Sequence, residues 1–105
     1  MPTTATQQCR TLDEIRANID LIDNDLVQLL SVRASYVKQA ASFKNNPQEV
    51  AAPQRVEQVI RRVRSLSKDH GLEPDIAEAT YRAMISAFID LEQGVFQARI
   101  QSTES

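Results

Sequence analysis

A row of apolar residues runs through the first half of the chain, from Leu12 to the segment around Lys44. Its members recur every three or four positions, which predicts one long amphipathic helix. Residues 12–44 contain no glycine or proline, so nothing inside them forces this helix to end. The row comprises Leu12, Ile15, Ile19, Ile22, Leu26, Leu29, position 33, Tyr36, Ala40 and Phe43.

One position of this row carries a charge. Arg33 keeps its charge in a protein, so a buried Arg33 needs an anion as its partner. An arginine at the edge of a helix bundle can instead extend its charge into solvent, so both interpretations stay open. Arg16 borders the same row and lies about 25 Å before Arg33 along a straight helix.

These two arginines are too far apart to bind one small anion from the same helix. Arg16 and Arg33 can serve one ligand only if they come from two copies of the helix. The helix itself would be on the order of 50 Å long. A compact chain of this size has a radius of gyration of only about 13 Å. We therefore predict an all-α fold with one very long first helix, assembled as an intertwined homodimer.

Capping and turn residues predict where the helices begin and end. Thr11, followed by Glu14, has the pattern of a capping box at the start of the first helix. Pro53 and Pro74 suit the first positions of two further helices, and Gly71 suits the left-handed residue between them. We expect these helices over 53–69 and from 74 to about 100, around a single domain of residues 11–100. Residues 1–10 are expected to form a disordered tail, and residues 101–105 a fraying one.

The connection after the first helix and the third helix hold further charged candidates. Asn45 to Gln48 and Ala51-Ala52 predict a short loop with Lys44 at its edge. Lys44 there can stabilise the helix end or bind a ligand, and both roles stay open. Arg55 lies just after this loop. Glu92 stands in the apolar row of the third helix, so it must pair with a cation or take up a proton.

Composition narrows the classes of function. The net charge of −2 lacks the basic footprint of a nucleic-acid-binding protein. Cys9 is the only cysteine, which leaves no disulfide and no cysteine-based metal set. No apolar run is long enough to span a membrane, and residues 1–10 lack the apolar core of a signal peptide, so we expect a cytoplasmic protein.

The candidate residues are cations and one acid, without an activated nucleophile. Such a set suits a small dianion whose reaction needs positioning and electrostatic stabilisation but no nucleophile. The set comprises Arg16, Arg33, Lys44, Arg55 and Glu92.

The first helix resembles that of the all-helical chorismate mutase family. The resemblance covers about residues 11–100 and implies the chorismate mutase II fold, an intertwined dimer of three-helix chains with two equivalent sites. The stretch from Phe43-Lys44 to Ala52–Val56 is most similar to the isochorismate pyruvate-lyase branch, whose members form salicylate. The matching positions are Ile15-Arg16, Ile19-Asp20, Ile22-Asp23, Leu29-Leu30, Arg33, Val37 and Phe43-Lys44.

The resemblance also implies roles for the charged residues. Arg33, Lys44 and Arg55 would come from one chain and Arg16 from the other, with the arginines holding the two carboxylates of the substrate. Lys44 would donate a hydrogen bond to the ether oxygen of the enolpyruvyl group, where negative charge grows as the C–O bond breaks. Glu92 would be the second donor to that oxygen.

The resemblance further implies that Val56 and Ile89 contact the substrate. Typical mutases carry a glutamate at the position of Val56, where it binds the ring hydroxyl of chorismate. Loss of such a hydrogen bond costs about 1–3 kcal/mol. The lyase branch has glutamine at the position of Glu92. Unlike that glutamine, Glu92 can donate a hydrogen bond only when its carboxylate is protonated. We therefore expect activity that rises toward acidic pH.

The resemblance and the residues leave four candidate functions. The leading one is an isochorismate pyruvate lyase, converting isochorismate to salicylate and pyruvate, with some chorismate mutase activity. The alternatives are a chorismate mutase proper, converting chorismate to prephenate, and a 4-amino-4-deoxychorismate mutase. A metabolite-sensing helical dimer without catalysis is the alternative from another class. The enzymatic reactions are pericyclic and require no covalent intermediate or cofactor.

Overall fold

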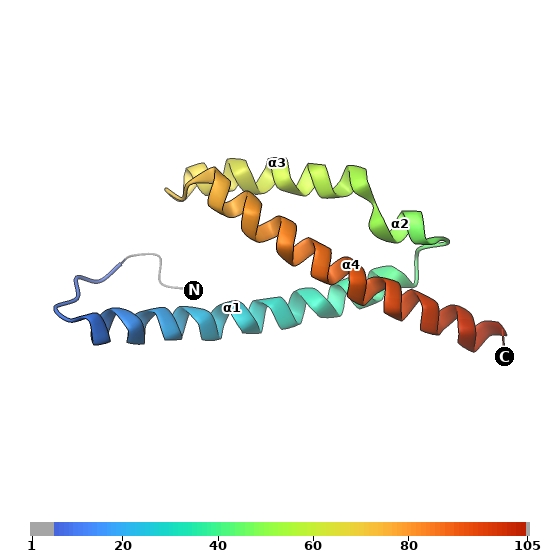
Figure 1. Cartoon of the computed structure of the whole chain (residues 1–105), viewed down its shortest axis with the longest axis horizontal. Helices are drawn as coiled ribbons and strands as arrows, with labels where there is room; N and C mark the ends of the chain where they lie inside the picture. The colour runs from blue at the N-terminus through green and yellow to red at the C-terminus, as the bar shows by residue number, and fades with distance from the viewer. Residues whose placement is uncertain (1–5, 105) are drawn as a thin grey trace. The chain divides into compact units, whose positions relative to one another are not determined.

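The structure is a computed structural model that describes residues 6–104. Within these residues it contains four helices and no strand (Figure 1). They are α1 (Leu12–Ala41), α2 (Pro47–Ala51), α3 (Pro53–Asp69) and α4 (Pro74–Glu104). The all-α class and the long first helix are confirmed. The chain divides after Arg33 into two compact units.

The first unit consists of residues before α1 and most of that helix. Residues 6–10 form no helix, and residues 1–5 of the predicted tail lie outside the described residues. The Thr11 Oγ1 accepts a hydrogen bond from the Glu14 amide at 3.1 Å, as the capping box predicts. The Glu14 carboxylate reaches back to the amide of Arg10 at 2.8 Å. The first bond satisfies an amide that the helix start leaves without a helical partner, and the second ties the preceding residue to the first turn.

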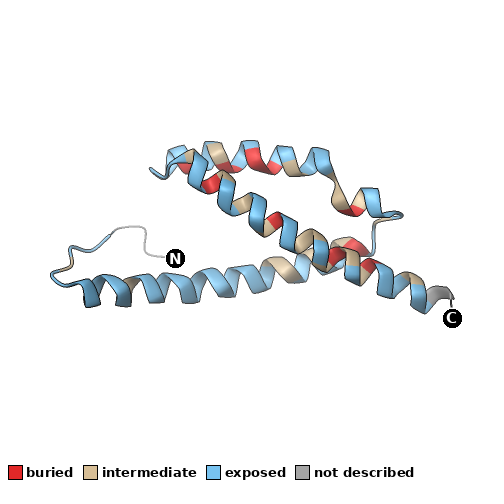
Figure 2. Ribbon diagram, in the orientation of Figure 1, coloured by how far each residue is buried: buried red, intermediate tan, exposed pale blue. Residues whose placement is uncertain are grey.

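The apolar row of α1 is exposed within the first unit. From Leu12 to Val32, every residue except Asn18 is exposed, as Figure 2 shows in blue. Ile22, in the middle of the row, retains 57% of its accessible surface. Exposed apolar patches of this kind occur where proteins bind other proteins, membranes or ligands.

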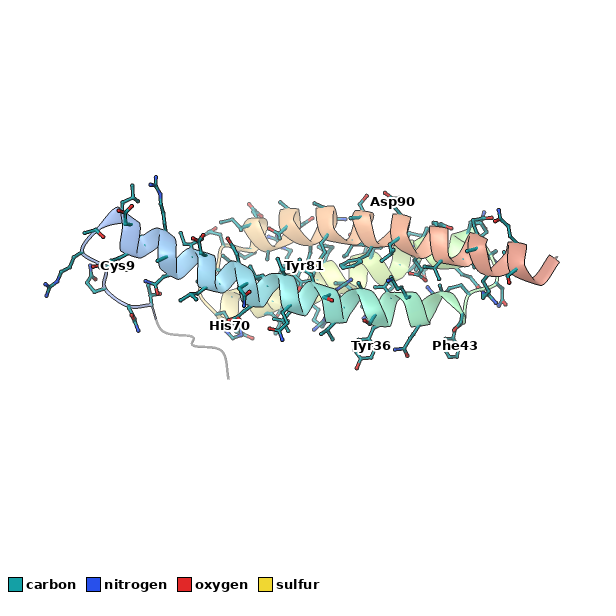
Figure 3. The ribbon with its side chains drawn as sticks, turned by 90° about the horizontal axis from the view of Figure 1, so that it is seen from below. Cys9, Tyr36, Phe43, His70, Tyr81 and Asp90 are labelled. Carbon is teal, nitrogen blue, oxygen red and sulfur yellow. The ribbon has the colours of Figure 1, made fainter. Side chains whose placement is uncertain are left out.

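The second unit is built on the α3–α4 pair. Its core contains buried residues from both helices: Val59, Ile60, Val63, Ala77 and Ile85. The helix α2 packs against the later part of α4, and Val50 and Phe96 from these two helices are almost completely buried. The last residue of α1, Ala41, is fully buried in this unit as well. Tyr36 and Phe43, in contrast, project outward (Figure 3).

An ion-pair network joins α3 and α4 along their outer side. Arg82 binds the Glu57 carboxylate through two hydrogen bonds of 2.9 Å and Glu78 through one of 2.7 Å. Arg64 binds Glu78 at 2.9 Å and Asp75 at 3.0 Å. The hydrogen bonds from Arg82 lower the pKa of Glu57 and Glu78 below the ordinary glutamate value. Because these groups are exposed or half-buried, the ion pairs are expected to add little stability.

The predicted helix ends are close to those observed. Pro53 and Pro74 begin α3 and α4, and Gly71 adopts the left-handed conformation with φ of 74°. Two predictions were wrong in detail. The third predicted helix, α4, continues to Glu104 instead of ending near residue 100. The expected loop after α1 contains the helix α2. None of the helices in the described region has the length and apolar character needed to cross a membrane.

Side-chain capping explains α2. The Asn46 Oδ1 accepts a hydrogen bond from the Glu49 amide at 2.9 Å. The Glu49 carboxylate accepts two from Asn45, one from its amide and one from its side chain, each at 3.2 Å. Pro47 occupies the first helical position, where its missing N–H is not needed. Ala52, with φ of 41°, ends α2 in the left-handed conformation, and Pro53 begins α3 directly after it.

Candidate active site

Lys44 and Glu92 form the centre of the candidate site. The Lys44 Nζ donates hydrogen bonds to Glu92 Oε2 at 3.0 Å and to the Glu49 carbonyl at 3.1 Å. The Glu92 side chain is 9% exposed and that of Lys44 25%. Of the two alternatives predicted for Glu92, a cation partner or a bound proton, the structure shows the cation partner. A buried carboxylate without such a partner would destabilise the fold by several kcal/mol, on the order of 3–5.

A pocket of about 430 Å³ lies beside Lys44. Its lining comes from the α1–α2 connection, from α2 and from the first turn of α3: Lys44, Glu49, Ala52, Pro53, Gln54 and Arg55. Lys44 and Arg55, both predicted site residues, therefore line the same pocket. Arg55 is exposed and donates a hydrogen bond to the Gln58 side chain at 2.7 Å, which leaves other guanidinium N–H groups for a ligand.

The turn between α2 and α3 explains how Lys44 and Arg55 come to line the same pocket. The left-handed Ala52 turns the chain between α2 and α3, so the first turn of α3 comes next to the end of α1. Helix α2 places the Glu49 carbonyl within reach of Lys44. The sequence analysis missed Glu49 as a site residue, although Asn46 followed by Glu49 has the pattern of a capping box.

The remaining predicted site residues lie elsewhere. Val56 and Ile89 are half-buried and pack against the α3–α4 core, and neither lines the pocket. Arg16 and Arg33 belong to the first unit. Arg16 is exposed and Arg33 half-buried, and the continuous helix keeps them about 25 Å apart along its axis. Their contact with a ligand stays a prediction.

The pocket is suited to anions that carry a reacting oxygen. The Arg55 guanidinium can bind a carboxylate, and the Lys44 ammonium group can donate to an oxygen that gains charge. Glu92, beside this ammonium group, can accept a hydrogen bond as a carboxylate or donate one as a carboxylic acid. None of these groups is an activated nucleophile, so the arrangement favours positioning and charge stabilisation over covalent catalysis.

Comparison with known proteins identifies the family of the chain. Residues 15–93 match the family of chorismate mutase type II, so the chain belongs to that family. The chain is 34% identical over 83 residues to the isochorismate pyruvate lyase of Pseudomonas aeruginosa, covering 79% of this chain and 82% of that protein. It is 33% identical over 75 residues to the chorismate mutase of Methanocaldococcus jannaschii, covering 70% and 76%, respectively. The resemblance inferred from the sequence is confirmed.

Proposed function

We propose that the chain is a pericyclic enzyme for chorismate-type dicarboxylates, acting mainly as an isochorismate pyruvate lyase with some chorismate mutase activity. The observation that carries this proposal is the pocket lined by Lys44 and Arg55, with Glu92 hydrogen-bonded to the Lys44 ammonium. The apolar Val56 at the position of the mutase glutamate favours the lyase. So does the similarity to the Pseudomonas aeruginosa enzyme.

The proposed chemistry uses charge without a nucleophile. In the lyase reaction the ether C–O bond breaks while one ring hydrogen moves to the enolpyruvyl group, which leaves as pyruvate, and the ring becomes salicylate. Lys44 donates a hydrogen bond to the ether oxygen as it gains negative charge. Arg55 holds a carboxylate of the substrate. A single donor to such an oxygen contributes roughly 10²–10³ in rate.

We further propose that the complete site contains residues from two chains. Arg33 and Arg55 would bind the substrate together with Arg16 of a second copy. The exposed apolar row of α1 supports this assembly, because a second copy of the chain would cover it. Val56 and Ile89 would then shape the wall next to the ring, from the core positions in which they pack.

The second candidate function is chorismate mutase, favoured by the similarity to the Methanocaldococcus jannaschii enzyme. The purified protein should be assayed in parallel with isochorismate, chorismate and 4-amino-4-deoxychorismate. We expect salicylate from isochorismate as the fastest reaction and slower formation of prephenate from chorismate. Faster turnover of chorismate or of the amino compound would assign a mutase instead. Binding of these compounds without any product would indicate a metabolite sensor.

The protonation of Glu92 is expected to control the rate. A carboxylate accepts hydrogen bonds, so Glu92 can donate to the ether oxygen only after it binds a proton. We expect kcat to rise toward acidic pH in the wild type. The Glu92→Gln variant should show a flatter profile, because an amide donates at any pH. Steady-state rates of both proteins between about pH 4.5 and 8.5 test this. Parallel profiles for the two proteins would remove Glu92 from this role.

A further inference from the structure

The C-terminal half of α4 holds the turn between α1 and α2 at several points. Glu92 binds the Lys44 side chain, as described above. The Gln93 Nε2 donates a hydrogen bond to the Pro47 carbonyl at 3.0 Å. Further along α4 than Gln93, the Arg99 Nη2 donates a hydrogen bond to the Lys44 carbonyl at 2.7 Å. Both the backbone and the side chain of Lys44 are therefore bound by α4.

Arg99 is well placed to fix this carbonyl. Lys44 lies between α1 and α2, outside both helices. Its backbone carbonyl therefore has no partner within a helix. A guanidinium group supplies a charge-assisted hydrogen bond, which is shorter and stronger than a neutral one. The Arg99 guanidinium also lies over the ring of Phe96, 5.3 Å from its centroid. Phe96 is only 1% exposed, so the ring is a rigid support for the guanidinium.

We propose that Arg99 is a positioning residue for Lys44, and its kinetic consequence rests on the proposed function. Arg99 itself does not line the pocket. It fixes the backbone of Lys44, so the long and flexible lysine side chain starts from one defined point. Glu92 and the Glu49 carbonyl then direct the ammonium group. Small displacements of a catalytic group lower rates strongly, because the barrier depends on its geometry.

Two substitutions and one control isolate this role. Arg99→Gln removes the charge-assisted hydrogen bond, and Arg99→Lys keeps a cation that can still reach the carbonyl. Gln97→Ala changes an exposed neighbour on α4 that has no part in the site. Thermal unfolding of each variant shows whether its fold is retained.

The first readout is independent of catalysis. Competitive acetylation with a limiting amine-reactive reagent, followed by mass spectrometry, compares Lys44 with Lys38 and Lys68 in the same molecule. We expect Lys44 of the wild type to react slowly, because its ammonium group is bound to Glu92 and Glu49. Arg99→Gln should raise the reactivity of Lys44 several-fold relative to the other two lysines. Arg99→Lys should restore part of the protection, and Gln97→Ala should leave it unchanged.

The second readout is the reaction itself. Because Lys44 acts on charge that develops in the transition state, Arg99→Gln should lower kcat about tenfold with little change in KM. Unchanged acetylation of Lys44 in Arg99→Gln would overturn the proposal, and so would raised acetylation with an unchanged kcat. A wild type without turnover would refute the proposed function and with it the kinetic role of Arg99. The acetylation pattern would then show separately whether Arg99 orders Lys44.

Discussion

Two inactive variants, Arg16→Ala and Lys44→Ala, are expected to recover about a quarter of the wild-type activity when equal amounts are unfolded and refolded together. Each variant by itself should lose activity by about 10²-fold or more, since each lacks a cation that holds or stabilises the reacting substrate. Recovery is expected because Arg16 would act in the site of the other chain. A mixed dimer would then contain one site with both residues intact.

The expected fraction follows from the symmetry of the proposed dimer. Random pairing makes about half of the dimers mixed, and each mixed dimer has one complete site out of two. The matched control is a mixture of Lys44→Ala and Arg55→Ala chains. Lys44 and Arg55 line one pocket of one chain, so no mixed dimer of these variants has a complete site and no activity should return.

The mixture must be shown to contain mixed dimers, for example by native mass spectrometry. Mixed Arg16→Ala and Lys44→Ala dimers without recovered activity would show that Arg16 does not act in the partner's site. Recovery in the Lys44→Ala and Arg55→Ala mixture would show that the pocket in one chain is not the functional unit.

Substitution of Ile22 by aspartate is expected to break the proposed dimer and strongly destabilise the protein. In the single chain Ile22 is 57% exposed, so a carboxylate at this position would cost little if the chain were a monomer. In the proposed dimer each of the two chains would bury one such carboxylate without a partner. An uncompensated buried charge costs about 3–5 kcal/mol. Sedimentation velocity and thermal unfolding at several protein concentrations would measure both effects.

Asn24→Asp is the matched control for this substitution. It adds the same carboxylate to an exposed position of α1 that is outside the apolar row. We expect this variant to keep the mass and the unfolding temperature of the wild-type dimer. If Ile22→Asp behaves in the same way as Asn24→Asp, the apolar row is not covered by a second copy and the proposed assembly is wrong.

The helices of this chain were largely predictable because their signals are local. Pro53, Pro74 and Gly71 mark helix ends through their own backbone preferences, and the row from Leu12 has an unbroken helical period. The helix α2 was missed because five residues are too few for a periodic pattern. It depends on the side chains of Asn46 and Glu49, and on its contact with α4.

The candidate site was predictable in its residue types more than in its contacts. The charge of Glu92 in an apolar row required a cation or a proton, and only the family resemblance, which brings Lys44 and Glu92 to the same ether oxygen, placed Lys44 near it. Arg99 gave no signal at all, because it acts on a backbone carbonyl that is distant in the chain. Contacts of this kind depend on how α4 packs against the α1–α2 connection, which periodicity does not encode.

The position of Ala52 between two helices limits how the length of this segment can vary among related chains. Ala52 is both the C-cap of α2 and the N-cap of α3, so no further linker residue separates the two helices. One inserted residue in α3 before Arg55 would turn its guanidinium by about 100° around the helix axis, away from Lys44. Homologous chains should therefore tolerate many exchanges of residue type in this segment, while insertions and deletions there should be rare among active members.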